Sequence, residues 1–317
     1  NKSDRYHILN ETHLIREYQK LLNLNPKLNQ LECNIVKGFI SKFITIQRKG
    51  IYRKKRDNNY KVAAKKVFNK IKNEKDVDFV DLIKFLFKFE AQEHGKRYSG
   101  DQTPNHVYYI DSLNQFFPRA LFINMIRDPR AVILSQKNKW KAVKRKNLPY
   151  FELLRTKANY HPITQSILWN RSIEAAKRGQ INIGTGKILN VFYEEFVSNP
   201  EKTMKVVCEF IETKYHKRML DISVSMSSNI NNPEKIGVDA KLKDKWKSLL
   251  SPTEIYIVEL LTRKQLKYLG YKVTGKKPNL IIFSAYLILF PLQICLAYTL
   301  SADRIRNPFF FFKKLFG

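Results

Sequence analysis

The sequence predicts an α/β fold with a parallel sheet, a helix-rich N-terminal region and a hydrophobic C-terminal helix. Two short apolar runs, 121–126 and 188–192, each precede a segment with helical periodicity, which is the order of a βαβ layering. Few Gly or Pro residues interrupt 1–90, and no charge interrupts 280–300. The 317 residues, 44% of them apolar, suffice for one large domain or two smaller ones.

In chain order, residues 1–90 are predicted to be mostly helical and Lys-rich. Residues 94–105 follow as a polar loop, and Asn105 at its end is expected to cap the next helix. That helix carries apolar side chains at three- and four-residue steps. A buried strand over 121–126 and a helix to about residue 140 complete the first half.

The second half repeats the alternation of helix and strand. The basic stretch 137–157 is predicted as a surface loop or short helices, and 162–178 as a helix with an apolar face. A buried strand over 188–192 leads to a turn in which Asn199 caps the following helix and Pro200 takes its first position.

The last part of the chain contains two predicted helices. Ser251 and Glu254 have the spacing of a capping box at the start of the first, and Gly270 ends it. The uncharged run 280–300 is long enough to span a bilayer and is flanked by basic residues on both sides. It is either a membrane span or in-plane anchor, or a helix packed against the domain or a partner. Membrane association is favoured over a cytoplasmic protein.

The formal charge of +30 implies attraction to anions, such as a nucleotide, an acidic glycan, nucleic acid or an anionic membrane. Nucleic acid is disfavoured because the aromatic residues of the basic stretch 37–72 keep the spacing of a buried face. Cys33, Cys208 and Cys295 show no CxxC spacing and are predicted to be buried thiols. With few scattered histidines, no metal site is expected.

The motif Arg127-Asp128-Pro129-Arg130 follows the first apolar run directly. An arginine at a strand tip offers a planar fork of donors, and Ser135 adds a hydroxyl in the next helix. The helix start adds free backbone N–H groups and a positive dipole end, so the arrangement suits a phosphate. The alternative is an ordinary strand-to-helix turn in which Asp128 caps the helix and Pro129 lies in its first turn.

Three separated blocks together resemble the sulfotransferase family, nearest to its protein-tyrosine and bacterial branches. They are the segments 103–106 with 117–135, 192–203, and 245–271. The resemblance divides the chain into a sulfotransferase-like domain over 1–272, made of a basic helical region (1–93) and a recognisable core (94–272), and a tail over 273–317. It implies a P-loop-like, three-layer fold around a central parallel sheet.

The resemblance also implies binding of the sulfate donor PAPS (3′-phosphoadenosine 5′-phosphosulfate), with no metal. Arg127 and Ser135 would hold its 3′-phosphate, and Tyr193 would lie near the nucleotide unless it is simply a core tyrosine at a strand end. Ser228 and Lys235, in a Ser-rich loop, match positions at which tyrosine-sulfating relatives contact the nucleotide.

The sequence departs from the family pattern in two places. The Gly/Ser/Thr-rich loop that binds the 5′-phosphosulfate is absent, and we expect a chain that lacks its first strand and that loop. The piece 184–187 matches only half of a phosphate loop and is expected to be a hairpin or loop. Gln102 stands where relatives commonly carry lysine. His106, Asp101 and His94 are the nearest candidates for a catalytic base, and none is assigned.

The resulting prediction is an enzyme that transfers a sulfuryl group from PAPS to a hydroxyl of a glycan, a peptide tyrosine or a small molecule. The alternative is a non-catalytic relative, or a basic protein that binds nucleic acid or an acidic polymer. An in-frame Gly/Ser/Thr-rich loop upstream in the gene would favour the enzyme.

Overall fold

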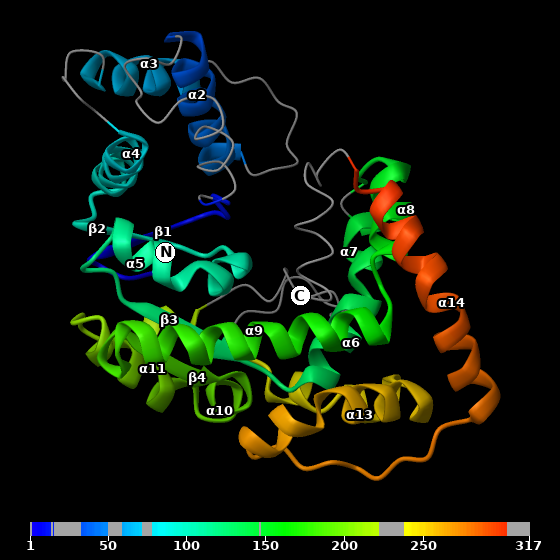
Figure 1. Cartoon of the computed structure of the whole chain (residues 1–317). Coiled ribbons are helices and arrows are strands. Elements are labelled where there is room, and N and C mark those ends of the chain that lie inside the picture. Colours follow the sequence, from blue (N-terminus) through cyan, green and yellow to red (C-terminus); the bar gives the residue numbers. More distant parts are fainter. Residues whose placement is uncertain are drawn as a thin grey trace. The chain divides into compact units, whose positions relative to one another are not determined.

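The computed structural model describes residues 2–13, 15, 33–49, 59–71, 78–145, 147–221 and 238–302. The chain divides into two compact units. The N-terminal unit contains residues 1–120 and 212–219, and the C-terminal unit contains residues 121–211 and 220–317 (Figure 1). The predicted domain boundaries at residues 93 and 272 stay a prediction.

Helices dominate the N-terminal unit, as the sequence predicts. They are α2 (Cys33–Lys49), α3 (Asn59–Ile71), α4 (Phe79–Glu93), the 3-10 helix η2 (Pro104–Tyr109), α5 (Ile110–Phe116) and the 3-10 helix η4 (Lys217–Leu220). Asp78 caps α4 by accepting a hydrogen bond from the Asp81 N–H at 2.8 Å.

Two strands of this unit were missed by the sequence prediction. β1 (Tyr6–Leu9) and β2 (Tyr98–Asp101) pair in parallel, with β2 inside the stretch predicted to be a loop. Neither four-residue segment is long or apolar enough to show a period. The strand exists because pairing satisfies its backbone. The two strands approach closely at Gly100, where an added Cβ would lie 2.8 Å from Cδ1 at the flexible tip of the Ile8 side chain.

The predicted cap at Asn105 is wrong. The chain turns into η2 one residue earlier, at Pro104, and Thr103 occupies the cap position. The Thr103 hydroxyl donates to the Asp101 carboxylate at 3.0 Å rather than capping the helix. Proline in the first turn, with its fixed φ, sets this start.

Strands β3 (Phe122–Ile126) and β4 (Ile188–Phe192) form a parallel pair in the C-terminal unit, in register from one end to the other. Four helices of this unit have proline in the first turn: α6 (Pro129–Lys137), α9 (Pro162–Ile183), α11 (Pro200–Phe210) and α13 (Pro252–Tyr268). The α/β fold predicted from strand and helix order is confirmed.

Shorter elements complete the C-terminal unit. They are α7 (Lys139–Arg145), α8 (Tyr150–Ala158), the 3-10 turn η3 (Thr185–Lys187), α10 (Tyr193–Ser198), the 3-10 turn η6 (Ala240–Lys243) and α12 (Trp246–Leu249). The piece 184–187 is thus a connection between α9 and β4, as predicted. Asn199 takes the cap position of α11, but its side chain makes no capping bond.

Two apolar clusters fix the β3–α6 turn from opposite sides. On one side Ala131, Ile133 and Leu134 of α6 pack with Trp246 of α12 and residues of α13. On the other side Ile126 at the end of β3 packs with Trp169 and Ile173 of α9, which runs along the strand pair in Figure 1. The turn between strand and helix is therefore held on a rigid support.

The predicted hydrophobic C-terminal helix is present as α14 (Leu280–Thr299). Within the described residues it is the one helix long and apolar enough to cross a membrane by length and composition. The cysteine prediction is only partly right. The Cys208 thiol is free and buried, whereas the Cys295 thiol is free and exposed because it lies on the outward side of α14.

Candidate functional site

The turn between β3 and α6 carries the Arg-Asp-Pro-Arg motif. Asp128 caps α6 by accepting a hydrogen bond from the Arg130 N–H at 2.8 Å, and Pro129 takes the first helical position. The Trp169 indole N–H donates to the Arg127 carbonyl at 3.0 Å, which ties the strand tip to α9. The features of an ordinary strand-to-helix turn are thus all present, and they hold Arg127 in place.

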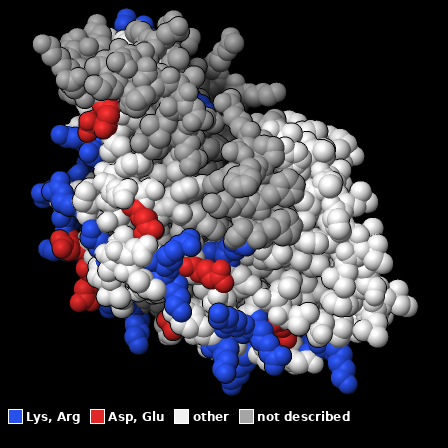
Figure 2. All heavy atoms as spheres, in the orientation of Figure 1, with Lys and Arg blue, Asp and Glu red and all other residues white. Residues whose placement is uncertain are grey.

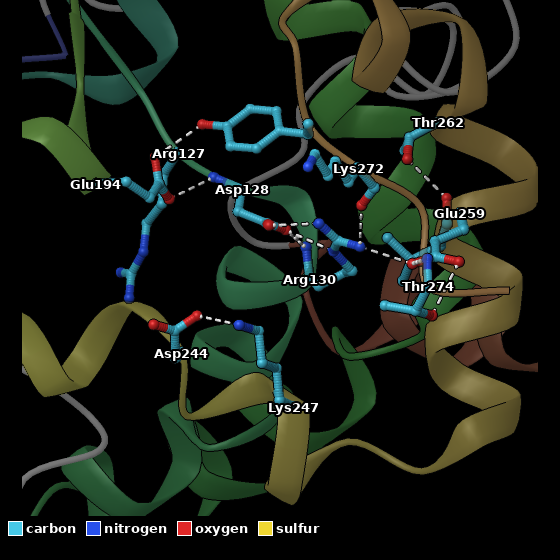
Figure 3. A network of polar contacts seen from close by, with 12 residues as sticks. Arg127, Asp128, Arg130, Glu194, Asp244, Lys247, Glu259, Thr262, Lys272 and Thr274 are labelled. Atoms are coloured by element: carbon cyan, nitrogen blue, oxygen red, sulfur yellow. Dashed lines mark hydrogen bonds and ion pairs between the residues drawn. The ribbon is translucent and has the colours of Figure 1, made fainter. Parts of the chain in front are cut away.

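Arg130 is the centre of a buried ionic network (Figure 3). Its guanidinium lies 2.7 Å from Asp128 Oδ2 and 2.6 Å from Glu259 Oε1, and it also donates to the Lys272 carbonyl at 2.9 Å. Its central carbon lies 4.0 Å from the centre of the Trp246 ring. Burial works against the charge of Arg130, but the two carboxylates keep its pKa above the ordinary value.

Glu194 joins the two strand ends. Its Oε1 accepts from the Asp128 N–H at 2.9 Å, and its Oε2 accepts from the Tyr271 hydroxyl at 2.8 Å. Burial and the neighbouring Glu194 charge raise the pKa of Tyr271, so that hydroxyl stays protonated and donates.

These contacts correct one expectation about the helix start. The N–H groups of Asp128 and Arg130 are already bonded to carboxylates, and so are not free for a phosphate. Two carboxylates at the α6 N-terminus also offset its positive dipole end. These two N–H groups are therefore not available to an anion, and side-chain donors near the turn, Arg127 among them, are the remaining candidates.

The side chain of Arg127 is directed away from the Arg130 network (Figure 3). Its guanidinium carbon lies 4.1 Å from the centre of the Tyr193 ring, at the end of the neighbouring strand. Its Nε is buried and makes no hydrogen bond to the residues that the structure describes. An arginine that lies over a ring, with a donor still unused, is suited to receive an anion.

The structure thus brings together two of the predicted site residues, Arg127 and Tyr193. Ser135 is half-buried in α6, and its predicted phosphate contact stays a prediction. Ser228 and Lys235 lie outside the described residues.

A second polar cluster, in the N-terminal unit, contains two of the candidate bases. His106 Nδ1 lies 3.3 Å from Asp101 Oδ2, and Asp101 also accepts from the hydroxyls of Thr12 and Thr103. Burial lowers the pKa of His106 to about 4 and raises that of Asp101. The His106 Nε2 is buried and unbonded within the part of the chain that is described. A carboxylate that orients one ring nitrogen leaves the other able to accept a proton.

The third candidate, His94, belongs to a different cluster. His7, Glu90 and His94 each offer a ligand atom within 4.8 Å of the others, a grouping that the scattered positions in the sequence concealed. The stacking of the two rings at 3.8 Å and the 2.8 Å contact of His94 Nδ1 with the Glu90 carbonyl are those of a packed histidine pair.

Sequence reasoning missed most of the residues that support Arg127. Arg130, Glu194, Glu259, Trp246 and Tyr271 form this support, and three of them lie in the third block of the family resemblance. One signal was present in the sequence: Trp246 and Tyr271 both stand in that block, although they lie far from the Arg-Asp-Pro-Arg motif along the chain.

Comparison with known proteins agrees with this geometry. The sequence profile of the sulfotransferase family matches residues 19–217, well over half of the chain. Protein-tyrosine sulfotransferase A of Caenorhabditis elegans is 24% identical over 177 residues, which are 53% of this chain and 43% of that protein. Protein-tyrosine sulfotransferase 2 of Gallus gallus is 26% identical over 130 residues, 40% of this chain and 32% of its own length. The chain thus matches less than half of either relative.

Among solved structures, the sulfotransferase domain from the curacin biosynthetic pathway aligns with a TM-score of 0.51 and 17% identity. The alignment covers 84% of this chain and 88% of that domain, which shows a shared fold. Family profile and relatives together show that the chain belongs to the sulfotransferase family.

Proposed function

We propose that the chain transfers a sulfuryl group from PAPS to a hydroxyl, with Arg127 as the main ligand of the donor's 3′-phosphate. The observation that carries the proposal is the state of Arg127. Its guanidinium is stacked on Tyr193, its backbone is fixed by Trp169, and its buried Nε is unbonded among the described residues. Burial of a donor without a partner is costly unless a ligand supplies the acceptor.

The remaining predicted nucleotide contacts are part of the same proposal. The Ser135 hydroxyl adds a second donor to the 3′-phosphate. The Tyr193 ring lies against the Arg127 guanidinium and holds it in position. Ser228 and Lys235 are retained as nucleotide contacts on the strength of the family resemblance. PAPS supplies a sulfuryl group whose bond to phosphate breaks as its bond to the acceptor oxygen forms.

A peptide tyrosine is the favoured acceptor, with glycans and small hydroxyl compounds as the alternatives. Two matched relatives are named protein-tyrosine sulfotransferases. The net charge of +30 suits acidic residues beside a target tyrosine, because opposite charges steer a substrate toward the enzyme.

Replacing Arg127 by alanine is expected to weaken binding of 3′,5′-ADP, the product nucleotide, by about 10- to 150-fold. This corresponds to about 1.5–3 kcal/mol, the range for a hydrogen bond to a charged group. Isothermal titration calorimetry measures it, with 5′-AMP as the matched ligand that lacks the 3′-phosphate. The substitution should abolish the preference for 3′,5′-ADP and leave 5′-AMP binding unchanged.

Arg178→Ala is the control variant, because Arg178 is an exposed arginine of α9 in the same unit. Its affinity for both nucleotides should equal that of the wild type. Equal affinity of Arg127→Ala and wild type for 3′,5′-ADP would refute the phosphate assignment. Binding of heparin or nucleic acid without nucleotide binding would favour the alternative, a basic binding protein.

A further inference from the structure

One face of α14 is packed on the C-terminal unit through aromatic contacts. The Phe283 ring meets Tyr256 of α13 at 5.7 Å. One turn and two turns later, Tyr286 and Phe290 lie 5.4 and 5.2 Å from the His161 ring. His161 is the buried cap of α9, so these contacts cover a group that would otherwise meet solvent or lipid.

Polar contacts continue the packing to the far end of the helix. Gln293 donates to the Ala158 carbonyl at the end of α8. Ser301, just beyond α14, is buried and lies 3.4 Å from the Asn159 side-chain amide. Packing therefore extends from the first turn of α14 to its last residues.

The opposite face of α14 is exposed and apolar. Ile281, Ile288 and Leu292 are 82%, 76% and 67% exposed, and Leu280, Leu289 and Leu296 lie on the same exposed surface. In Figure 2 the side of the molecule occupied by α14 is white, without basic or acidic atoms. Large apolar patches on a soluble protein mark a contact with a membrane or a partner.

This apolar surface extends onto α8. The two helices are in contact, and α8 exposes Tyr150 and Phe151. Aromatic side chains with one polar end are enriched where membranes meet water.

The segment that leads into α14 carries charges of one sign. From residue 260 to residue 302 the sequence contains no acidic residue and six basic ones: Arg263, Lys264, Lys267, Lys272, Lys276 and Lys277. Lys276 and Lys277 are exposed immediately before α14. Figure 2 shows basic atoms along the lower edge of the white surface. Basic residues around an apolar helix favour the headgroup region of an anionic bilayer.

We propose that α14 lies in the plane of an anionic membrane surface, with its exposed face in the lipid and its other face still packed on the C-terminal unit. A span of the same helix is possible by length alone, because 20 residues reach about 30 Å. Spanning would remove every contact from Phe283 to Ser301, expose the buried His161 and carry Ser301 to the far side of the bilayer.

Vesicle flotation of the full-length chain tests the lipid contact. The wild type should float with vesicles of phosphatidylcholine and phosphatidylserine, and less with phosphatidylcholine alone or at high salt. The double variant Ile288→Asp/Leu292→Asp should lose at least about tenfold in vesicle affinity, because two apolar anchors are replaced by charges that the lipid excludes. Leu260→Asp is the matched control, a 50% exposed leucine on α13 that should leave binding unchanged.

Cross-linking distinguishes an in-plane helix from a span. In a chain whose three native cysteines are replaced by alanine, Asn159→Cys and Ser301→Cys are joined with a short bis-thiol reagent before and after vesicle binding. Equal cross-linking in both states supports the in-plane helix, because a span would separate the two sites by about 30 Å. Loss of the cross-link on binding, absence of flotation, or a stable dimer in solution that covers α14 would each overturn the proposal.

Discussion

Replacing Arg130 by alanine is expected to lower the free energy of unfolding by about 3–5 kcal/mol, the cost of breaking a buried ion pair by removing one partner. The variant leaves the carboxylates of Asp128 and Glu259 buried without their shared cation. It also removes the cation–π contact with the Trp246 ring and the hydrogen bond to the Lys272 carbonyl. Arg130→Lys should restore little, because a lysine ammonium cannot bond two carboxylates in the planar geometry of a guanidinium.

Chemical denaturation followed by circular dichroism measures this loss. The matched control is Arg127→Ala, three residues earlier in the same motif, which should cost at most about 1 kcal/mol through its contact with Tyr193. Replacement of Arg130 should thus lower the stability of the fold, whereas replacement of Arg127 should lower the affinity for the nucleotide. Equal stability of Arg130→Ala and Arg127→Ala would disprove the structural role given to Arg130.

Replacing Glu254 by alanine is expected to lower the free energy of unfolding by about 2–4 kcal/mol. This carboxylate is 1% exposed and completes the capping box of α13 with Ser251. It accepts from Lys137 of α6 at 2.8 Å and from the Tyr160 hydroxyl at 2.6 Å. Its removal leaves the Tyr160 hydroxyl and the Ser251 N–H unpaired, whereas the partly exposed Lys137 can turn to solvent.

The control for Glu254 is Glu201, an exposed glutamate in the first turn of α11. It pairs with Lys205, one turn further along the helix, at 2.8 Å. Glu201→Ala should cost only about 0.3–0.5 kcal/mol, as exposed helical pairs do. Thermal or urea unfolding of both variants decides the matter. Similar losses for the two glutamates would show that burial of Glu254 adds nothing.

Glu254 also predicts a pH dependence of stability. Burial raises its pKa, but the hydrogen bonds from Lys137, Tyr160 and Ser251 outweigh burial, so the net pKa lies below the ordinary 4.5. The unfolded chain therefore takes up the proton first as the pH falls. The stabilisation of the folded state by the Glu254 carboxylate is present in full above about pH 4.5 and is lost as the pH falls through the lowered pKa. Glu254→Gln should show a shallower loss of stability below that pH than the wild type.

Local sequence patterns predicted much of the C-terminal unit because they report local chemistry. The apolar runs at β3 and β4, the prolines that begin α6 and α11, and the capping box of α13 each act within a few residues. The same reasoning failed for β1 and β2, because strands of four residues are too short to show a pattern and form only through their pairing.

The candidate site was predicted only in part for the same reason. Arg127 could be selected because it follows an apolar strand and Tyr193 because of the family resemblance, and the two lie in contact. The roles of Arg130 and Glu194 could not be read from the motif. They depend on partners 129 and 77 residues away in sequence, Glu259 and Tyr271.

By itself the sequence determined the order of strands and helices, the arginine at the strand tip and the apolar C-terminal helix. Periodicity, capping and motif spacing are properties of neighbouring residues, and they can therefore be read from the sequence. Only the tertiary structure decided which arginine is buried in carboxylates, which is available for an anion, and which face of α14 is covered. Those outcomes depend on burial and on partners brought together from distant parts of the chain, and burial decides whether a charge stabilises the fold or binds a ligand.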